Sequence, residues 1–367
     1  MGENIKEHPM TETDHPEGAF RTHLTSELLR YSFRYESHNI DRERYKDEPF
    51  SLKAVIKDKI LRLGASRGFY RTPDIDYGVI KLDGLERAYL LLEDQLSKDL
   101  FVKLLAYRIL GYRRVRLPLN NPEYWKLRQS MGKCVEKRGT FTGIPIAGSL
   151  DLCSVDGVRL HAHPLGVMNT FFLEQYRCPR AGIGVKPGDV VIDGGGCWGD
   201  TALYFARTGS RVFCFECMPS NIAIIEENLR LNPALAAKVS VVQKALSNRS
   251  GEKAVFRDNG PGSRPAADSR GVEVETQTID DLVAANSLDR VDFIKMDIEA
   301  AEPDALMGAE QTLRKHRPQL AISIYHDARH FACIPNWLAD LNLGYRFFID
   351  HFTIHSEETV LFARSGA

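Results

Sequence analysis

The sequence predicts an α/β protein built on a doubly wound, mostly parallel sheet, preceded by a mostly helical N-terminal domain. Three observations carry this prediction. From about residue 189 onward, β-rich runs alternate with helix-like segments, a glycine cluster follows the first of these runs, and residues 21–125 show mainly helical periodicity. Alternation of this kind implies crossover connections that place helices on both faces of a sheet.

The composition narrows the class of protein. The chain has 367 residues, 48 Lys and Arg against 49 Asp and Glu, and seven cysteines. Length favours two domains or one enlarged α/β domain, and the balanced charge disfavours a nucleic-acid partner. No apolar run approaches the ~18–20 residues of a transmembrane segment, and the polar N-terminus lacks a signal peptide's apolar stretch. We therefore expect a cytoplasmic protein with reduced thiols.

The organisation along the chain suggests three parts. We expect a mobile tail over residues 1–20, an accessory domain of helices and small β-runs over 21–165, and the α/β domain over 166–367. The accessory domain holds a clear helix from Leu96 to Leu110, which Gly111 ends.

Within the α/β domain the elements follow in order. After the run ending at Asp193, we expect strands at 211–216, 239–243, 291–297, 318–325, 344–350 and 357–363, and helices at 199–208, 219–231, 302–315 and 332–341. Residues 350–356 are too few for a helical crossover, so the last two strands should pair antiparallel. A β-like excursion over 252–277 has a Gly- and Pro-containing loop that we expect to cap a site.

The glycine loop is the sharpest local signal. Gly194, Gly196 and Gly199 fit the dinucleotide-binding pattern G-x-G-x-x-G, and Glu216 closes the next strand, where an acid binds ribose hydroxyls. An NAD(P)-dependent oxidoreductase or epimerase is therefore one interpretation. Asp193, however, would stand beside the pyrophosphate, whereas it suits the cationic S-adenosylmethionine. We therefore favour S-adenosylmethionine.

Charged residues also follow later strands. Lys295, Asp297 and Glu299 alternate at one strand end, and His326 and His351 follow the next two. Ligands of doubly wound sheets bind at strand carboxyl ends, and histidine serves as a base or a metal ligand near neutral pH. A structural ion pair around Lys295 is the alternative.

Six ordered blocks resemble the FkbM family of methyltransferases. The blocks, within about residues 166–364, are VIDGGGCWGDTALYFA, FECMPSN, KALSNRSG, TIDDLV, FIKMDIEAAE and RPQLAISIYH. The stretch LLEDQLSKDLFVKLLAYRILGYRRVRLPLNNPEYW is similar to the leader of a bacterial subgroup associated with polysaccharide modification. The resemblance implies a Class I methyltransferase sheet with an antiparallel last strand, and methyl transfer from S-adenosylmethionine to a hydroxyl of a sugar, glycan or sugar-containing natural product.

The resemblance also implies which residues bind the cofactor. These are Asp193, Gly194 and Gly196 at the methionine moiety, Glu216 at the ribose, Asn221 and Ala245 near the adenosine, and Gln175 and Tyr176 in an entry helix over the cofactor. Two positions depart from the family pattern: Cys217 stands in place of Pro, and Ala300 in place of Gly. Alanine calls for ordinary backbone angles, so the geometry around Glu299 is the open point.

Methyl transfer needs a group that takes the hydroxyl proton. We expect His326 to be this base, assisted by Asp297, with His351 as the competitor; a divalent metal held by Asp297, Glu299 and His326 is the alternative. A non-catalytic cofactor-binding subunit also stays open, as does a homo-oligomer. The expected partner is a small-molecule or glycan substrate.

Overall fold

The computed structural model describes residues 16–32, 34, 39, 83–144, 148–265 and 270–366, which form two compact units. The first unit comprises the described residues up to Pro118 together with Ile354–Ser356, and the second runs over Leu119–Thr353 and Glu357 onward. None of the helices in these described ranges is long and apolar enough to cross a membrane.

The first unit is helical. Its helices are α1 (Pro16–Ser32), α3 (Leu85–Leu91) and α4 (Gln95–Leu110). Asp94 caps α4 by accepting from the Ser97 N–H at 2.7 Å, and Gly111 ends it with φ 80°, as its sequence predicts. Residues 16–20, assigned to the tail from sequence, form the first turns of α1, while residues 1–15 lie outside the described ranges.

The second unit begins earlier than the domain boundary expected near residue 165. Helix α5 (Pro122–Ser130) and η3 (Met131–Cys134) lead into an antiparallel sheet of β1 (Val135–Ile144), β2 (Gly148–Val155) and β3 (Val158–Ala162). Side chains of β2 and β3 belong to the same buried cluster as those of the central sheet, Leu160 and Val191 among them. This shared core is why the division falls after Pro118.

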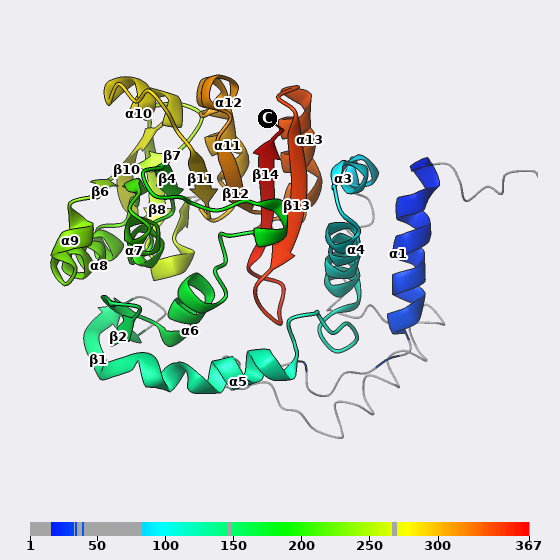
Figure 1. Cartoon of the computed structure of the whole chain (residues 1–367), viewed down its shortest axis with the longest axis horizontal. Helices are drawn as coiled ribbons and strands as arrows, with labels where there is room; N and C mark the ends of the chain where they lie inside the picture. The colour runs from blue at the N-terminus through cyan, green and yellow to red at the C-terminus, as the bar shows by residue number, and fades with distance from the viewer. Residues whose placement is uncertain are drawn as a thin grey trace, which may run out of the picture. The chain divides into compact units, whose positions relative to one another are not determined.

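A seven-stranded sheet forms the centre of the second unit (Figure 1). Its order is β13-β14-β12-β11-β4-β5-β6. The strands are β4 (Val190–Gly194), β5 (Arg211–Phe215), β6 (Val239–Val242), β11 (Phe293–Met296), β12 (Gln319–Ser323), β13 (Tyr345–His351) and β14 (Thr359–Ser365). Only β14 runs antiparallel to its neighbours in this sheet as described, pairing with β12 and β13. The chain order of the strands reverses between β4 and β11, which pair parallel, so their carboxyl ends lie side by side.

Helices connect these strands. They are α7 (Asp200–Arg207), α8 (Pro219–Arg230), α9 (Pro233–Ala236), α10 (Ile279–Ala285), α11 (Glu302–Met307), α12 (Glu310–His316) and α13 (His330–Asp340). The helix expected over 302–315 is divided into α11 and α12. At the division, a Cβ on Gly308 would lie 2.2 Å from the Ser247 carbonyl oxygen, so glycine allows this close approach.

The excursion after β6 forms a second small sheet. It pairs β7 (Ala245–Leu246), β10 (Val272–Gln277), β8 (Lys253–Arg257) and β9 (Arg264–Pro265) in that order, with η6 (Gly260–Gly262) between β8 and β9. The remaining short elements are α6 (Pro164–Val167), η4 (Met168–Phe172) and η5 (Pro179–Ala181). All seven cysteines are free, as expected for reduced thiols.

Candidate functional site

The glycine loop between β4 and α7 packs against the ends of two other strands. A Cβ on Gly195, whose φ is 81°, would lie 2.0 Å from the Asp297 carbonyl oxygen. A Cβ on Gly196 would lie 2.2 Å from Cys214 Sγ. The loop therefore needs glycine for close approach as well as for backbone conformation. It fixes the end of β4 against the ends of β11 and β5.

Asp193 lies beneath this loop. It is fully buried, Lys295 Nζ is 3.1 Å from its Oδ1, and the Thr201 hydroxyl donates to its Oδ2 at 2.7 Å. Lys295 also donates to the carbonyl oxygens of Gly194 and Gly195, at 3.0 and 2.6 Å. Burial alone lowers the pKa of Lys295, but the carboxylates of Asp193 and Asp297 outweigh it and raise that pKa. The ion pair weighed as an alternative for Lys295 is present, and it supports the loop.

Glu216, at the end of β5, accepts several hydrogen bonds. The N–H groups of Cys217 and Met218 donate to its Oε1 at 2.7 and 2.8 Å, and Asn221 Nδ2 donates to its Oε2 at 3.3 Å. Burial raises the pKa of Glu216, and these bonds oppose the rise. A proline in place of Cys217 could not donate, so this departure from the family pattern adds a backbone bond to the carboxylate.

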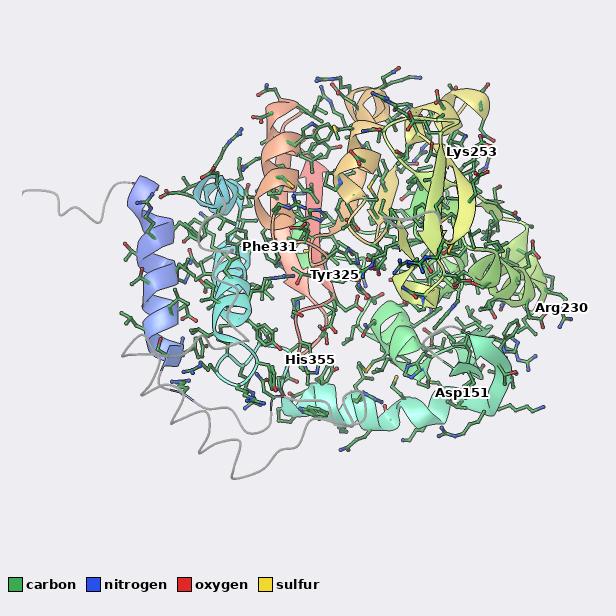
Figure 2. All side chains as sticks on the ribbon, turned by 180° about the vertical axis from the view of Figure 1, so that it is seen from behind. Asp151, Arg230, Lys253, Tyr325, Phe331 and His355 are labelled. Atoms are coloured by element: carbon green, nitrogen blue, oxygen red, sulfur yellow. The ribbon has the colours of Figure 1, made fainter. Side chains whose placement is uncertain are left out.

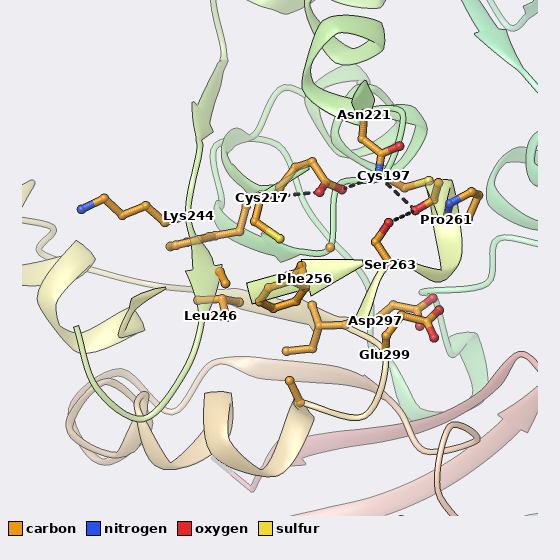
Figure 3. A pocket seen from close by; sticks show the side chains of 17 residues that line it. Cys197, Cys217, Asn221, Lys244, Leu246, Phe256, Pro261, Ser263, Asp297 and Glu299 are labelled. Carbon is orange, nitrogen blue, oxygen red and sulfur yellow. Dashed lines mark hydrogen bonds between the residues drawn. The ribbon is translucent and has the colours of Figure 1, made fainter. Parts of the chain in front are cut away.

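A pocket opens beside Glu216 (Figure 3). Ala245, Leu246 and Phe256 give it an apolar wall. It is lined by Gly195, Cys197, Phe215, Glu216, Cys217, Asn221, Lys244, Ala245, Leu246, Phe256, Gly260, Pro261, Ser263, Asp297, Ile298, Glu299 and Ala301. The excursion over 252–277 thus contributes part of the wall, as expected.

The charged side chains that line this pocket are mostly acidic. Asp297 and Glu299 lie together at one side of it (Figure 3), and Glu216 also lines it. The lining cation, Lys244, points away in that view and is paired with Glu275 at 2.7 Å. The pocket is therefore acidic.

The hydroxyl groups of two tyrosines bind Asp297. Tyr176 donates to Oδ2 at 2.9 Å and Tyr325 to Oδ1 at 3.0 Å; Tyr325 follows β12 (Figure 2). Burial, more than the nearby carboxylates, raises the pKa of both tyrosines well above the usual value, so both remain hydrogen-bond donors. Gln175 and Tyr176 stand in a turn after η4 instead of on the expected entry helix, and Gln175 donates to Glu358 at 2.5 Å.

His326 lies among three carboxylates. Its Nε2 is 3.3 Å from Asp297 and 3.5 Å from Glu299, and its Nδ1 is 3.0 Å from Glu302. Desolvation lowers the pKa of His326, but these carboxylates outweigh it and raise the pKa to about 11. The imidazole is therefore protonated at neutral pH. It can act as a base only when the carboxylate charge is offset by another group.

The other expected site residues lie at different places. His351, at the end of β13, shares a hydrogen bond of 2.8 Å with Thr359 across the final hairpin. Glu302, which the sequence did not single out, is fully buried at the start of α11, and its Oε2 is 3.5 Å from His330 Nδ1. Glu302 is the last residue of the block FIKMDIEAAE. It comes close to His326, which follows β12, because the chain turns sharply at Glu299 and Ala300.

That reversal uses unusual backbone angles. Glu299 and Ala300 have φ values of 54° and 78°. The expectation that Ala300 keeps ordinary angles is wrong: it occupies the left-handed region that glycine adopts without strain. The turn keeps this shape because both its ends are fixed, Asp297 by the tyrosines and Glu302 by the Ile298 N–H at 2.9 Å.

These features define the class of protein. The strand order, the antiparallel β14 and the acidic pocket at the ends of β4, β5 and β11 form a methyltransferase-like α/β fold. Residues 181–347 match the model of the Methyltransferase FkbM domain. This match confirms, over that range, the resemblance that the sequence shows to the FkbM family.

Two known proteins are similar to this chain. The 2-O-methyltransferase NoeI of Sinorhizobium fredii is 29% identical over 154 residues, which cover 36% of this chain and 62% of NoeI. The crystal structure of methyltransferase FkbM from Methylobacillus flagellatus KT aligns with a TM-score of 0.50 at 18% identity, covering 85% of this chain and 71% of that one. The second similarity supports the fold.

Proposed function

We propose that the chain is an S-adenosylmethionine-dependent O-methyltransferase that acts on a hydroxyl of a sugar, glycan or sugar-containing natural product. The acidic pocket beside Glu216 carries the proposal, because it combines a carboxylate suited to ribose hydroxyls with an apolar wall suited to an adenine. The name of the relative NoeI supports O-methylation. The sugar acceptor follows from the family resemblance, by analogy.

The residues present fit this cofactor. Glu216 and Asn221 would hold the ribose, and Ala245, Leu246 and Phe256 would contact the adenine. Asp297 would face the cationic end of the cofactor, because its carboxylate attracts the positively charged sulfonium and ammonium groups. Asp193 would act from beneath the glycine loop, because its carboxylate is fully buried. The bound cofactor supplies an electrophilic methyl group.

The chain's own residues must align the acceptor and take its proton. Asp297 and His326 stand together at the acidic side of the pocket, 3.3 Å apart. Asp297, oriented by two tyrosine hydroxyls, would direct the acceptor oxygen. His326 would accept the proton once bound charge lowers its pKa. His351 would serve a structural role through its bond to Thr359.

An NAD(P)-dependent oxidoreductase is the second candidate, because the glycine pattern and Glu216 fit it too. Asp193 and Asp200 disfavour it. Asp193 is fully buried at the end of β4 and Asp200 is half-buried at the start of α7, and a dinucleotide would place its pyrophosphate between them. Two carboxylates at that position oppose an anion.

The test is transfer of a labelled methyl group from S-adenosylmethionine to a panel of nucleotide sugars and oligosaccharides, with and without EDTA. We expect label in at least one acceptor, lost in the Asp297→Asn variant. Binding of S-adenosylhomocysteine without transfer to any acceptor would instead indicate a non-catalytic subunit.

A further inference from the structure

The side chains around His326 form a cluster whose charges do not balance. Asp297, Glu299 and Glu302 bring three carboxylates within 3.5 Å of a single imidazole. His330 Nδ1 lies 3.5 Å from Glu302, and even with both imidazoles counted the carboxylates outnumber them. Lys295, the nearby cation, is already paired with Asp193. The cluster therefore retains excess negative charge.

The cluster is also buried and poorly satisfied. The side chain of His326 is 6% exposed and that of Glu302 fully buried. The contacts of both His326 nitrogens with the carboxylates lack hydrogen-bond geometry, and the same holds for Glu302 Oε2. Buried polar groups normally have such partners, and buried like charges are retained only when a counter-charge joins them.

The donor atoms have a spacing that suits one metal ion. Asp297, Glu302 and His326 each offer an atom, and these atoms all lie within 4.8 Å of one another. Two ligands on one ion with bonds of about 2.0–2.4 Å are at most about 4.8 Å apart. The hydrogen bonds from Tyr176 and Tyr325 leave a lone pair on each Asp297 oxygen.

We propose that Asp297, Glu302 and His326 bind a divalent cation. Carboxylates suit Mg²⁺ and Mn²⁺ and imidazole suits later transition metals, so Mn²⁺ meets both kinds of donor. From the sequence we expected Glu299 as the third ligand beside Asp297 and His326, and in the structure Glu302 is that ligand. Glu299 stands 3.5 Å from His326 at the pocket wall and is close enough to join as a further ligand.

The position of the site gives the cation a role, and this part rests on the proposed function. Asp297 lines the pocket and is also a ligand. A cation there would contact the acceptor's oxygen atoms and make the target hydroxyl more acidic, and His326 would then serve as a ligand of the cation in place of acting as the base. The acceptor class this favours is one with two neighbouring oxygens, such as a sugar diol.

The test is a titration of the metal-free full chain with Mn²⁺. Binding is measured as the loss of the electron paramagnetic resonance signal of free Mn²⁺. We expect one equivalent to bind with a Kd below 1 mM, and Glu302→Gln and Asp297→Asn each to weaken binding at least tenfold. Asp304→Asn is the matched control. It removes an exposed carboxylate on the same helix, α11, and should change the Kd less than twofold.

Glu302 is fully buried, so a variant that fails to fold gives no result, and Asp297, at 19% exposure, then decides the outcome. No binding at 1 mM Mn²⁺, or equal affinity in both variants and the control, overturns the proposal. Calorimetry with S-adenosylhomocysteine on the metal-free chain separates the two claims. If that ligand binds and Mn²⁺ does not, the metal site falls and the proposed function stands.

Discussion

The Glu216 carboxylate is the feature on which cofactor binding depends most directly. We predict that Glu216→Gln weakens binding of S-adenosylhomocysteine. Oε1 accepts the N–H groups of Cys217 and Met218, and Oε2 accepts from Asn221. In either amide orientation, the new NH₂ group of Gln would face a donor, and one acceptor for the ribose would be lost.

The size of the effect follows from the bonds involved. A hydrogen bond to a charged group contributes about 1.5–3 kcal/mol, and every 1.4 kcal/mol changes an affinity about tenfold. Loss of one such bond should therefore raise the Kd roughly 10- to 150-fold. Isothermal titration calorimetry measures it, with circular dichroism as the check on folding.

The matched control is Glu226→Gln, which removes an exposed carboxylate from the same helix that carries Asn221. It should leave the Kd within twofold of the wild type. If Glu216→Gln folds and binds as tightly as this control, the ribose site has been assigned to the wrong residue.

Three further predictions concern the backbone and a thiol of the site. Ala300→Gly should raise the free energy of unfolding by about 0.5–1 kcal/mol in urea denaturation, because glycine relieves the strain of φ 78° at an entropic cost; a loss of stability would show that the turn is unstrained. Gly195→Ala should lower the same free energy by about 2–4 kcal/mol, since its Cβ would lie 2.0 Å from the Asp297 carbonyl oxygen; a fully stable variant would contradict this close packing. Burial, with Glu216 adding to it, raises the pKa of the Cys217 thiol to about 12. The rate of its alkylation by iodoacetamide, measured by mass spectrometry, should therefore rise about tenfold per pH unit between pH 7 and pH 10 and stay below the rate at the exposed Cys333. A rate that levels off below pH 10 would refute the raised pKa.

The sequence was informative where the chain is regular. The alternation of runs after residue 189 predicted the central strands and helices to within a few residues, and the short final connection predicted that β14 would run antiparallel. These features depend on local hydrophobic periodicity and connection length, which a single sequence displays.

Contacts between side chains that are far apart in the sequence were harder to predict from it. Tyr176 lies 121 residues from Asp297 along the chain, and only the folded sheet shows that its hydroxyl donates to this carboxylate. Glu302 was missed for a similar reason, because its contact with His326 depends on the strained turn at Glu299 and Ala300. The protonation of His326 likewise depends on carboxylates from separate elements.

The domain boundary illustrates a different limit. Residues 135–162 look like short, separate β-runs in the sequence, which placed them in the accessory domain. In the structure, Leu160 and its neighbours complete the same buried cluster as the central sheet. Local pattern identifies a strand, but which core it completes is decided by packing.

The central claim is that the acidic pocket binds a cationic methyl donor and excludes a dinucleotide. Calorimetric titration of the full chain with S-adenosylmethionine, S-adenosylhomocysteine, NAD⁺ and NADP⁺ tests it most directly. We predict that the first two bind with a stoichiometry of one and that neither dinucleotide binds at 1 mM. Binding of NAD⁺ or NADP⁺ without binding of S-adenosylmethionine would contradict the account.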